Sequence, residues 1–183
     1  MRVELTHHFA SPLRDGFDYI TEPRNWPEYW PGLIRVQPGS RWRAPGDRAR
    51  VTMRLLGRIV ELEMTLRTFD PYRLIEYTSV QRGLPDVRHE RAFSAVGDGF
   101  QYRLAVEFVP RARLRGAFDR ALLRRAAERT MQRTVANLED RLHEVGSARA
   151  ATRGMAGAQS EPPSRPVDRF ATGSKRASGN TSA

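Results

Sequence analysis

The sequence predicts one α+β domain in which a curved antiparallel β-sheet of about seven strands wraps around a long C-terminal α-helix. Apolar and polar residues alternate through most of the first 108 residues, which is typical of strands with one buried face. Short turn signals separate these stretches, and short connections favour antiparallel neighbours. One long stretch with helical periodicity follows, and nothing else in the chain is long enough to cover such a sheet.

The first 32 residues predict a strand and two short helices. Residues 3–9 alternate between apolar and polar, as in a half-buried strand. Ser11 and Pro12 then mark the start of a helix. Glu22 before Pro23 marks its end, because proline disfavours helical geometry in the residue before it. Residues 25–32 are rich in proline and aromatic residues and are too short for more than a helical turn.

Residues 33–110 predict the remaining strands. Apolar residues recur in short stretches, most of them with strict alternation, at residues 49–55, 60–66, 74–80, 87–95 and 100–108. Glycine and proline mark turns between them, at residue 57 and at residues 70–71, 83–86 and 97–99. Because one side of each strand is apolar and the other polar, we expect one face of the sheet to be covered and the other to be wet.

The C-terminal part predicts the covering helix and a tail. Apolar residues at steps of three and four, from about residue 114 to residue 145, predict an amphipathic helix about 45 Å long. Gly146 is the expected end of this helix. Residues 147–183 are mostly Ala, Gly, Ser, Thr, Pro and Arg, and such a stretch cannot bury enough surface to offset its ordering entropy. We therefore expect a domain over residues 1–146 and a disordered basic tail over residues 147–183.

The charge of the chain predicts no specific nucleic-acid site. The net charge is +10, and all but one of the 31 basic residues are arginines, which are scattered along the chain. Specific nucleic-acid binding is expected where such residues cluster on one element. The net positive charge alone is sufficient for weak contact with an anionic membrane surface, because such contact needs no specific arrangement of the basic residues.

The residue types also exclude several chemistries. The chain has no cysteine, which excludes disulfides, thiol nucleophiles and zinc–thiolate sites. His7 and His8 face opposite sides of one strand, so we predict neither a metal site nor a cofactor. There is no apolar run of about 20 residues and no signal-peptide pattern at the N-terminus, so a cytoplasmic protein is expected.

Four motifs stand out in the sequence: Asn25-Trp26-Pro27-Glu28-Tyr29-Trp30-Pro31-Gly32, Pro45-Gly46-Asp47, Asp70-Pro71 and His89-Glu90-Arg91-Ala92-Phe93. They resemble motifs of the START-like superfamily, also named SRPBCC, of polyketide cyclases, dehydrases and lipid-transfer proteins. The resemblance covers about residues 2–145 and implies the helix-grip fold, with a cavity between the concave face of the sheet and the long helix. Such a cavity would bind a hydrophobic small molecule. The superfamily includes aromatase/cyclases, lipid carriers and hormone receptors, so the resemblance does not choose between chemistries.

Two polar residues share the predicted inner face of the sixth strand. Val87 and Phe93 bracket His89 and Arg91 on one side of that strand. One hypothesis is that Arg91 binds a carboxylate, carbonyl or enolate of a ligand, with His89 as an acid or base near neutral pH. The alternatives are that the strand is inverted or bulged, or that Arg91 pairs with an acidic neighbour such as Glu107.

Other polar and aromatic residues leave similar alternatives. Tyr77 and Tyr102 are expected on the inner face, where each phenol either donates to a ligand or packs with one satisfied hydroxyl. Trp26 and Trp30 lie where the superfamily places the cavity entrance, and they form either its rim or the core beneath the short helices. Ser79 has no recognisable partner in the sequence, so a serine hydrolase is not predicted.

The side chains that we expect to contact a ligand are Trp26, Trp30, Met53, Met64, Tyr77, His89, Arg91, Tyr102, Phe118 and Leu122. The leading hypothesis is a non-catalytic carrier or sensor of a polyketide, quinone, fatty acyl group or isoprenoid. The alternative is an aromatase/cyclase-type enzyme, in which Arg91 stabilises an enolate and Tyr102 or His89 moves protons. A third hypothesis is a module that docks to a partner or membrane and whose pocket is vestigial.

Overall fold

The computed structural model describes residues 1–55, 57–80, 86–108 and 117–158. The strands are β1 (Arg2–Phe9), β2 (Leu33–Val36), β3 (Arg48–Leu55), β4 (Arg58–Asp70), β5 (Leu74–Val80), β6 (Val87–Val96) and β7 (Gly99–Phe108). The helices are α1 (Leu13–Thr21), the single 3-10 turn η1 (Pro23–Asn25), α2 (Trp26–Tyr29) and α3 (Ala117–Ala158).

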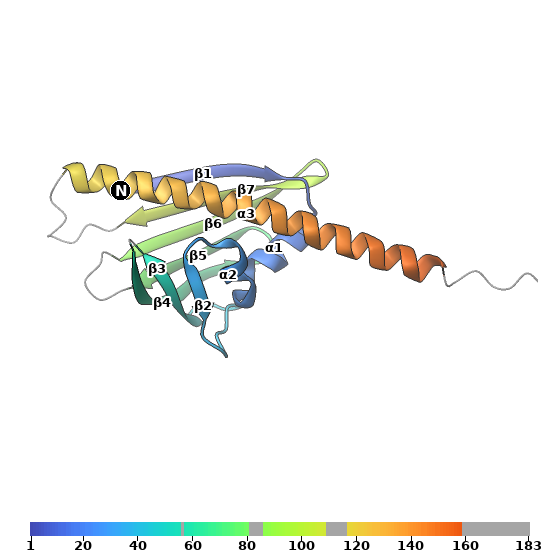
Figure 1. Ribbon diagram of the computed structural model, residues 1–183, viewed down its shortest axis with the longest axis horizontal. Coiled ribbons are helices and arrows are strands. Elements are labelled where there is room, and N and C mark those ends of the chain that lie inside the picture. Colours follow the sequence, from blue (N-terminus) through green and yellow to red (C-terminus); the bar gives the residue numbers. More distant parts are fainter. Residues whose placement is uncertain (56, 81–85, 109–116, 159–183) are drawn as a thin grey trace, which may run out of the picture.

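The strands form one antiparallel sheet with the order β1-β7-β6-β5-β4-β3-β2. Strands β2 to β7 are sequential neighbours, and β1 pairs with β7, so the first and last strands lie side by side. Helix α3 crosses the sheet in front of β1 and β7 (Figure 1) and contacts β1, α1 and α2. The predicted fold, a curled sheet around a long C-terminal helix, is confirmed.

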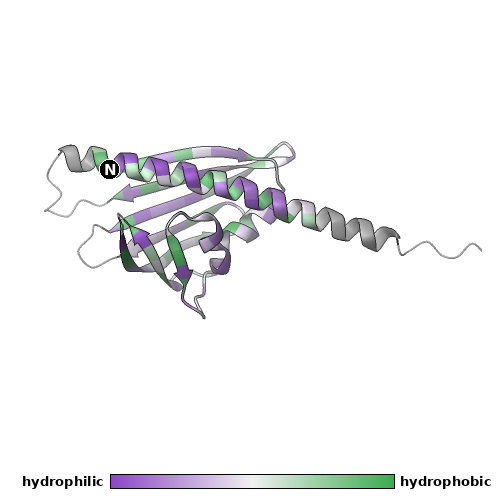
Figure 2. Cartoon of the chain, in the orientation of Figure 1, coloured by the Kyte–Doolittle hydropathy of each residue, from purple (hydrophilic) through white to green (hydrophobic). Residues whose placement is uncertain are grey.

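The inner and outer faces of the sheet follow the alternation of the sequence. Hydrophilic and hydrophobic residues alternate along the strands (Figure 2), and the apolar set packs toward α3. At the end of the sheet where α1 lies, aromatic side chains fill the inner face: Phe9, Phe17, Phe93, Phe100 and Tyr102. The packing is tight there, because a Cβ atom at Gly16 of α1 would lie 2.3 Å from the ring of Phe100. We call this region the filled end.

The outer face carries arginine and glutamate side chains that pair across strands. Glu90 of β6 pairs with Arg2 of β1 at 2.9 Å and with Arg103 of β7. Arg88 pairs with Glu107 at 3.9 Å. The hypothesis that Glu107 pairs with Arg91 is therefore wrong, because the two side chains lie on opposite faces of the sheet. These exposed pairs are typically worth less than about 1 kcal/mol each.

Helix α3 is longer than the sequence predicts. It continues through Gly146 to Ala158, so the expected helix end at Gly146 is wrong. The division into a domain over residues 1–146 and a disordered tail stays a prediction. A glycine costs a helix only about 1 kcal/mol, and the following alanines and arginines are strong helix formers. The rest of the predicted tail, residues 159–183, lies outside the described residues, as do residues 109–116 and the predicted turn at residues 83–85. Within the described chain, no helix combines the length and the apolar character needed to cross a membrane.

Candidate functional site

A cavity of about 210 Å³ separates the inner face of the sheet from α3 at the end opposite the filled end. We call this region the hollow end. Strands β3 to β7 contribute Met53, Leu55, Leu62, Met64, Tyr77, Ser79, Val87, His89, Arg91, Leu104, Val106 and Phe108. Residue Trp30 follows α2, and α3 adds Leu123, Ala126, Ala127, Thr130, Met131 and Thr134. Methionine and aliphatic side chains make up most of this lining, whereas aromatic rings pack against one another at the filled end.

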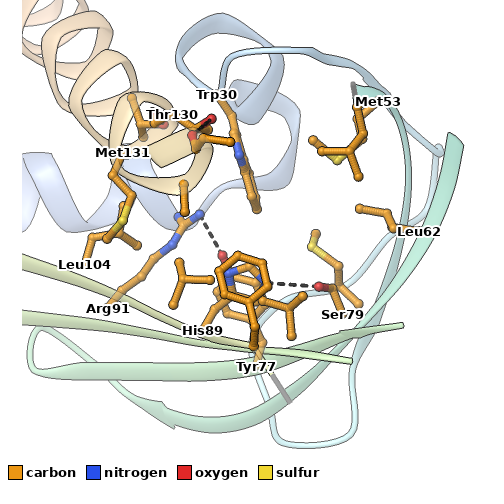
Figure 3. A pocket seen from close by; sticks show the side chains of 18 of the residues that line it. Trp30, Met53, Leu62, Tyr77, Ser79, His89, Arg91, Leu104, Thr130 and Met131 are labelled. Carbon is orange, nitrogen blue, oxygen red and sulfur yellow. Dashed lines mark hydrogen bonds between the residues drawn. The ribbon is translucent and has the colours of Figure 1, made fainter. Parts of the chain in front are cut away.

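Arg91 is a buried cation at the wall of this cavity. Its side chain is on the inner face of β6 and the residue is only 4% exposed, so the alternative of an inverted strand is wrong. Nη1 donates to the hydroxyl of Tyr29 at 3.1 Å and to the carbonyl of Ile20 at 3.5 Å, while Nη2 donates to the hydroxyl of Tyr77 at 3.0 Å. The last bond is drawn in Figure 3.

The surroundings stabilise the charge of Arg91 without a carboxylate. None of the ion pairs between described residues involves this guanidinium. Ile20 lies near the C-terminus of α1, where the helix dipole places partial negative charge. The rings of Trp30 and Tyr77 lie 5.2 and 5.3 Å from the guanidinium carbon. Burial raises the pKa of Tyr29 to about 12, so this phenol stays neutral.

Two buried polar atoms near this cation remain without a partner among the described residues. One is Nε of Arg91 and the other is the hydroxyl of Tyr102. An unpaired buried donor costs about 1–3 kcal/mol, and more when it is charged. The site is therefore short of acceptors for the donors that it buries.

His89 lies beside Arg91 and is neutral at physiological pH. Its ring stacks on Tyr77 with centroids 4.4 Å apart, and its Nε2 lies 3.0 Å from Oγ of Ser79. Burial, together with the charge of Arg91, lowers the pKa of His89 to about 3. The sequence suggested an acid or base that titrates near neutral pH, and this imidazole does not.

Ser79 has a histidine partner that the sequence analysis missed. The alternation of the sequence places both residues on the inner face of adjacent strands. Only the pairing of β5 with β6 shows the register that makes them diagonal neighbours. A serine–histidine pair suggests a nucleophile with its base. However, an imidazole with a pKa near 3 is too weak a base to activate a hydroxyl at neutral pH.

The structure brings together six of the ten side chains expected to contact a ligand: Trp30, Met53, Met64, Tyr77, His89 and Arg91. Trp26 and Tyr102 are buried but do not line the cavity, and Trp26 donates its indole N–H to the carbonyl of Ile20 at 3.1 Å. Leu122 is 55% exposed, and its neighbour Leu123 lines the cavity instead. The side chain of Phe118 lies outside the described residues.

The face of α3 that lines the cavity was hard to predict, because each of the two adjacent leucines, Leu122 and Leu123, could belong to it. Either could begin an apolar stripe with helical spacing, and the angle at which α3 docks decides between them. The observed stripe is Leu123, Ala126, Ala127, Thr130, Met131 and Thr134. The hydroxyls of Thr130 and Thr134 bond to carbonyls one turn earlier in the helix. Among the residues that the structure describes, no group of three or more acidic or histidine side chains could hold a metal ion.

Known proteins share this architecture. The family model described as "Polyketide cyclase / dehydrase and lipid transport" matches residues 1–143. A solved structure from Thermus thermophilus is similar at 14% sequence identity, covering 79% of this chain and 99% of that chain, with a TM-score of 0.67. A START superfamily protein from Mycobacterium smegmatis is similar at 13% identity, with 79% and 98% covered and a TM-score of 0.67.

A third similar structure is the Zhui aromatase/cyclase from Streptomyces sp. R1128, at 18% identity, with 78% and 93% covered and a TM-score of 0.67. No curated protein sequence matches the chain. At these identities the solved structures establish a common fold. The family model also establishes the family, because its match runs from residue 1 to residue 143, within α3, and so covers more than half of the chain. The chain therefore belongs to the polyketide cyclase/dehydrase and lipid transport family.

Proposed function

We propose that the protein binds a hydrophobic small molecule in the cavity between the sheet and α3, as a carrier or sensor. The observation that carries this proposal is the space of about 210 Å³ left between two elements that are otherwise packed. Thirteen of the 19 lining side chains are apolar. Transfer of apolar ligand surface from water into such a space is favourable by about 25 cal/mol per Å². The family description, which includes lipid transport, is consistent with this function.

The lining groups favour binding over acid–base chemistry. The pKa of His89 is lowered to about 3 and burial raises the pKa of Tyr77, so neither side chain titrates near neutral pH. General acid–base catalysis is most effective when the pKa of the group lies near the operating pH. Apart from the fixed charge of Arg91, the described lining of the cavity is electrically neutral.

Native mass spectrometry of gently purified protein tests this proposal, with an environment-sensitive apolar dye as a second probe. We expect a lipophilic molecule to copurify or the dye to bind in the cavity. Ala126→Phe places a ring in the cavity and should abolish both signals. Ala136→Phe is the matched control, since it makes the same change on an exposed position of α3. Equal binding by both variants would mean that the ligand binds outside this cavity. If the wild-type protein binds neither a lipophilic molecule nor the dye, the proposal fails and the docking-module hypothesis is left.

A second candidate function is an aromatase/cyclase-type activity, and Arg91 favours it. A fixed cation in an apolar site stabilises an enolate that forms in a transition state. The family description names cyclases and dehydrases, and one similar structure is an aromatase/cyclase. Turnover of a poly-β-ketone surrogate that is lost in a folded Arg91→Ala variant would support it. Unchanged turnover in that variant, or none in the wild type, would contradict it.

A further inference from the structure

The size of the cavity restricts the ligand. An apolar cavity of about 150 Å³ holds one benzene molecule, and sites for drug-sized ligands begin near 300 Å³. At about 210 Å³, the cavity of this protein lies between these two values. This volume accommodates one ring with a short substituent, or a short acyl chain, and several fused rings would extend beyond it.

The guanidinium of Arg91 has unused donors. It carries five N–H groups, of which two on Nη1 and one on Nη2 have acceptors among the described residues. Nε has no acceptor among the described residues, and neither has the second hydrogen of Nη2. A guanidinium can hold the two oxygens of a carboxylate, and its free Nη2 hydrogen is available to one of them.

The hydroxyl of Tyr77 adds a further donor at the same place. It accepts a hydrogen bond from Nη2 of Arg91 at 3.0 Å, and its own hydrogen bonds to no described residue. A hydroxyl that accepts from a cation is polarised and becomes a stronger donor. Arg91 and Tyr77 both line the cavity, so these hydrogens surround one corner of it.

The opposite side of the cavity is apolar. In Figure 3, Arg91 and Met53 lie on opposite sides, and Leu62 lies near Met53. Met53 and Met64 are flexible and polarisable side chains that adapt to a ring or a chain. The cavity therefore has a cationic corner and an apolar side, which together match an amphiphile with one negative charge.

We propose that the ligand is a small amphiphilic monoanion, with a carboxylate bound by Arg91 and Tyr77 and with one ring or a short acyl chain among Met53, Leu62 and Met64. The inference rests on the hydrophobic-ligand function proposed above and adds the charge and the size of the ligand.

Isothermal titration calorimetry with the full chain tests the charge. The probes are 3-phenylpropanoate and its neutral isostere 3-phenylpropanamide. We expect the carboxylate to bind at least tenfold more tightly than the amide. The preference should disappear in Arg91→Met, because methionine keeps much of the buried volume and removes the charge. Arg88→Met is the matched control, since this arginine lies on the same strand and is exposed on the outer face.

Tyr77→Phe keeps the proposal testable if Arg91→Met does not fold. It removes one donor, retains the ring that stacks on His89, and should reduce the preference for the carboxylate several-fold. A length series tests the size: octanoate should bind more tightly than palmitate. Equal affinities for carboxylate and amide, or tighter binding of palmitate, would overturn this inference and leave the hydrophobic-ligand function standing. A wild-type protein that binds neither the probes nor the apolar dye would remove both.

Discussion

The two ends of the inner sheet face are covered by the same helix and differ in what lies beneath it. At the filled end, the rings of Phe17 and Phe93 are 5.0 Å apart and those of Phe9 and Phe100 are 5.1 Å apart. At the hollow end, a lining made mostly of leucine, methionine, valine and alanine leaves about 210 Å³ unfilled. One backbone architecture thus carries a packed core and a cavity, and the size of the side chains decides which forms.

Arg91 and Tyr77 lie at the boundary between the two ends. Arg91 bonds to Tyr29 and Ile20 on the side of the short helices, and it also lines the cavity. The comparison predicts that stability depends mainly on the filled end, while ligand choice depends on the hollow end. The following changes test that division.

The largest effect is expected from Phe100→Ala at the filled end. Phe100 is fully buried and contacts Phe9 and Phe93, so the variant leaves a void that its neighbours cannot close. The free energy of unfolding, measured in urea, should fall by about 3–5 kcal/mol. Leu62→Ala at the hollow end should cost no more than about 2 kcal/mol, because this side chain already borders empty space. Equal losses would contradict the division between the two ends.

The pH dependence of the free energy of unfolding shows whether the cavity at the hollow end excludes water. The pKa of His89 is about 3 in the folded protein and about 6.5 in the unfolded chain, so the unfolded chain binds more protons between these values. Stability should therefore fall as the pH is lowered through this window, by about 2 kcal/mol at pH 5 relative to pH 8 from this group alone. His89→Gln should lose this component, and His143→Gln, an exposed control on α3, should retain it. If NMR titration instead gives His89 a pKa near 6.5, water occupies the cavity.

Gly16→Ala should destabilise the filled end although alanine favours a helix. The new Cβ would lie 2.3 Å from Cε1 and Cζ of Phe100, and overpacking of this kind costs about 1–3 kcal/mol. The helix propensity of alanine returns about 1 kcal/mol, so a net loss of up to about 2 kcal/mol is expected in urea unfolding. Gly146→Ala in α3 is the matched control. Its Cβ would meet no atom within 4 Å, so that variant should be as stable as the wild type or slightly more stable.

The sequence was sufficient for the architecture and for the inner face of the strands. A strand has only two faces, so strict alternation determined which side chains face α3. The five inner-face residues predicted in this way all line the cavity: Met53, Met64, Tyr77, His89 and Arg91. Turns and periodicity also gave six of the seven strands and their order along the chain, and the short β2 (Leu33–Val36) shows no such alternating stretch.

The features that the sequence could not predict depend on register and on docking. A helix has many faces, so the choice between Leu122 and Leu123 required the angle at which α3 crosses the sheet. The partner of Ser79 required the register of β5 against β6. Two acceptors for Arg91 are Ile20 of α1 and Tyr29 of α2. Local sequence patterns do not show how these helices pack against the sheet. The helix end predicted at Gly146 was wrong because one glycine costs a helix only about 1 kcal/mol and the alanines after it favour the helix.

The smallest effect is expected from Ala127→Leu at the hollow end. Ala127 lines the cavity, so the added atoms enter existing space and gain contacts in place of forcing neighbours apart. Urea unfolding should change by less than about 1 kcal/mol, while the affinity for an apolar dye falls because less volume remains. Ala49→Leu is the matched control at a packed position, because Ala49 is fully buried on β3, and overpacking there should cost about 1–3 kcal/mol. A loss in Ala127→Leu as large as that of Ala49→Leu would mean that the hollow end is as tightly packed as the rest of the core, and the division drawn between the two ends would then fail.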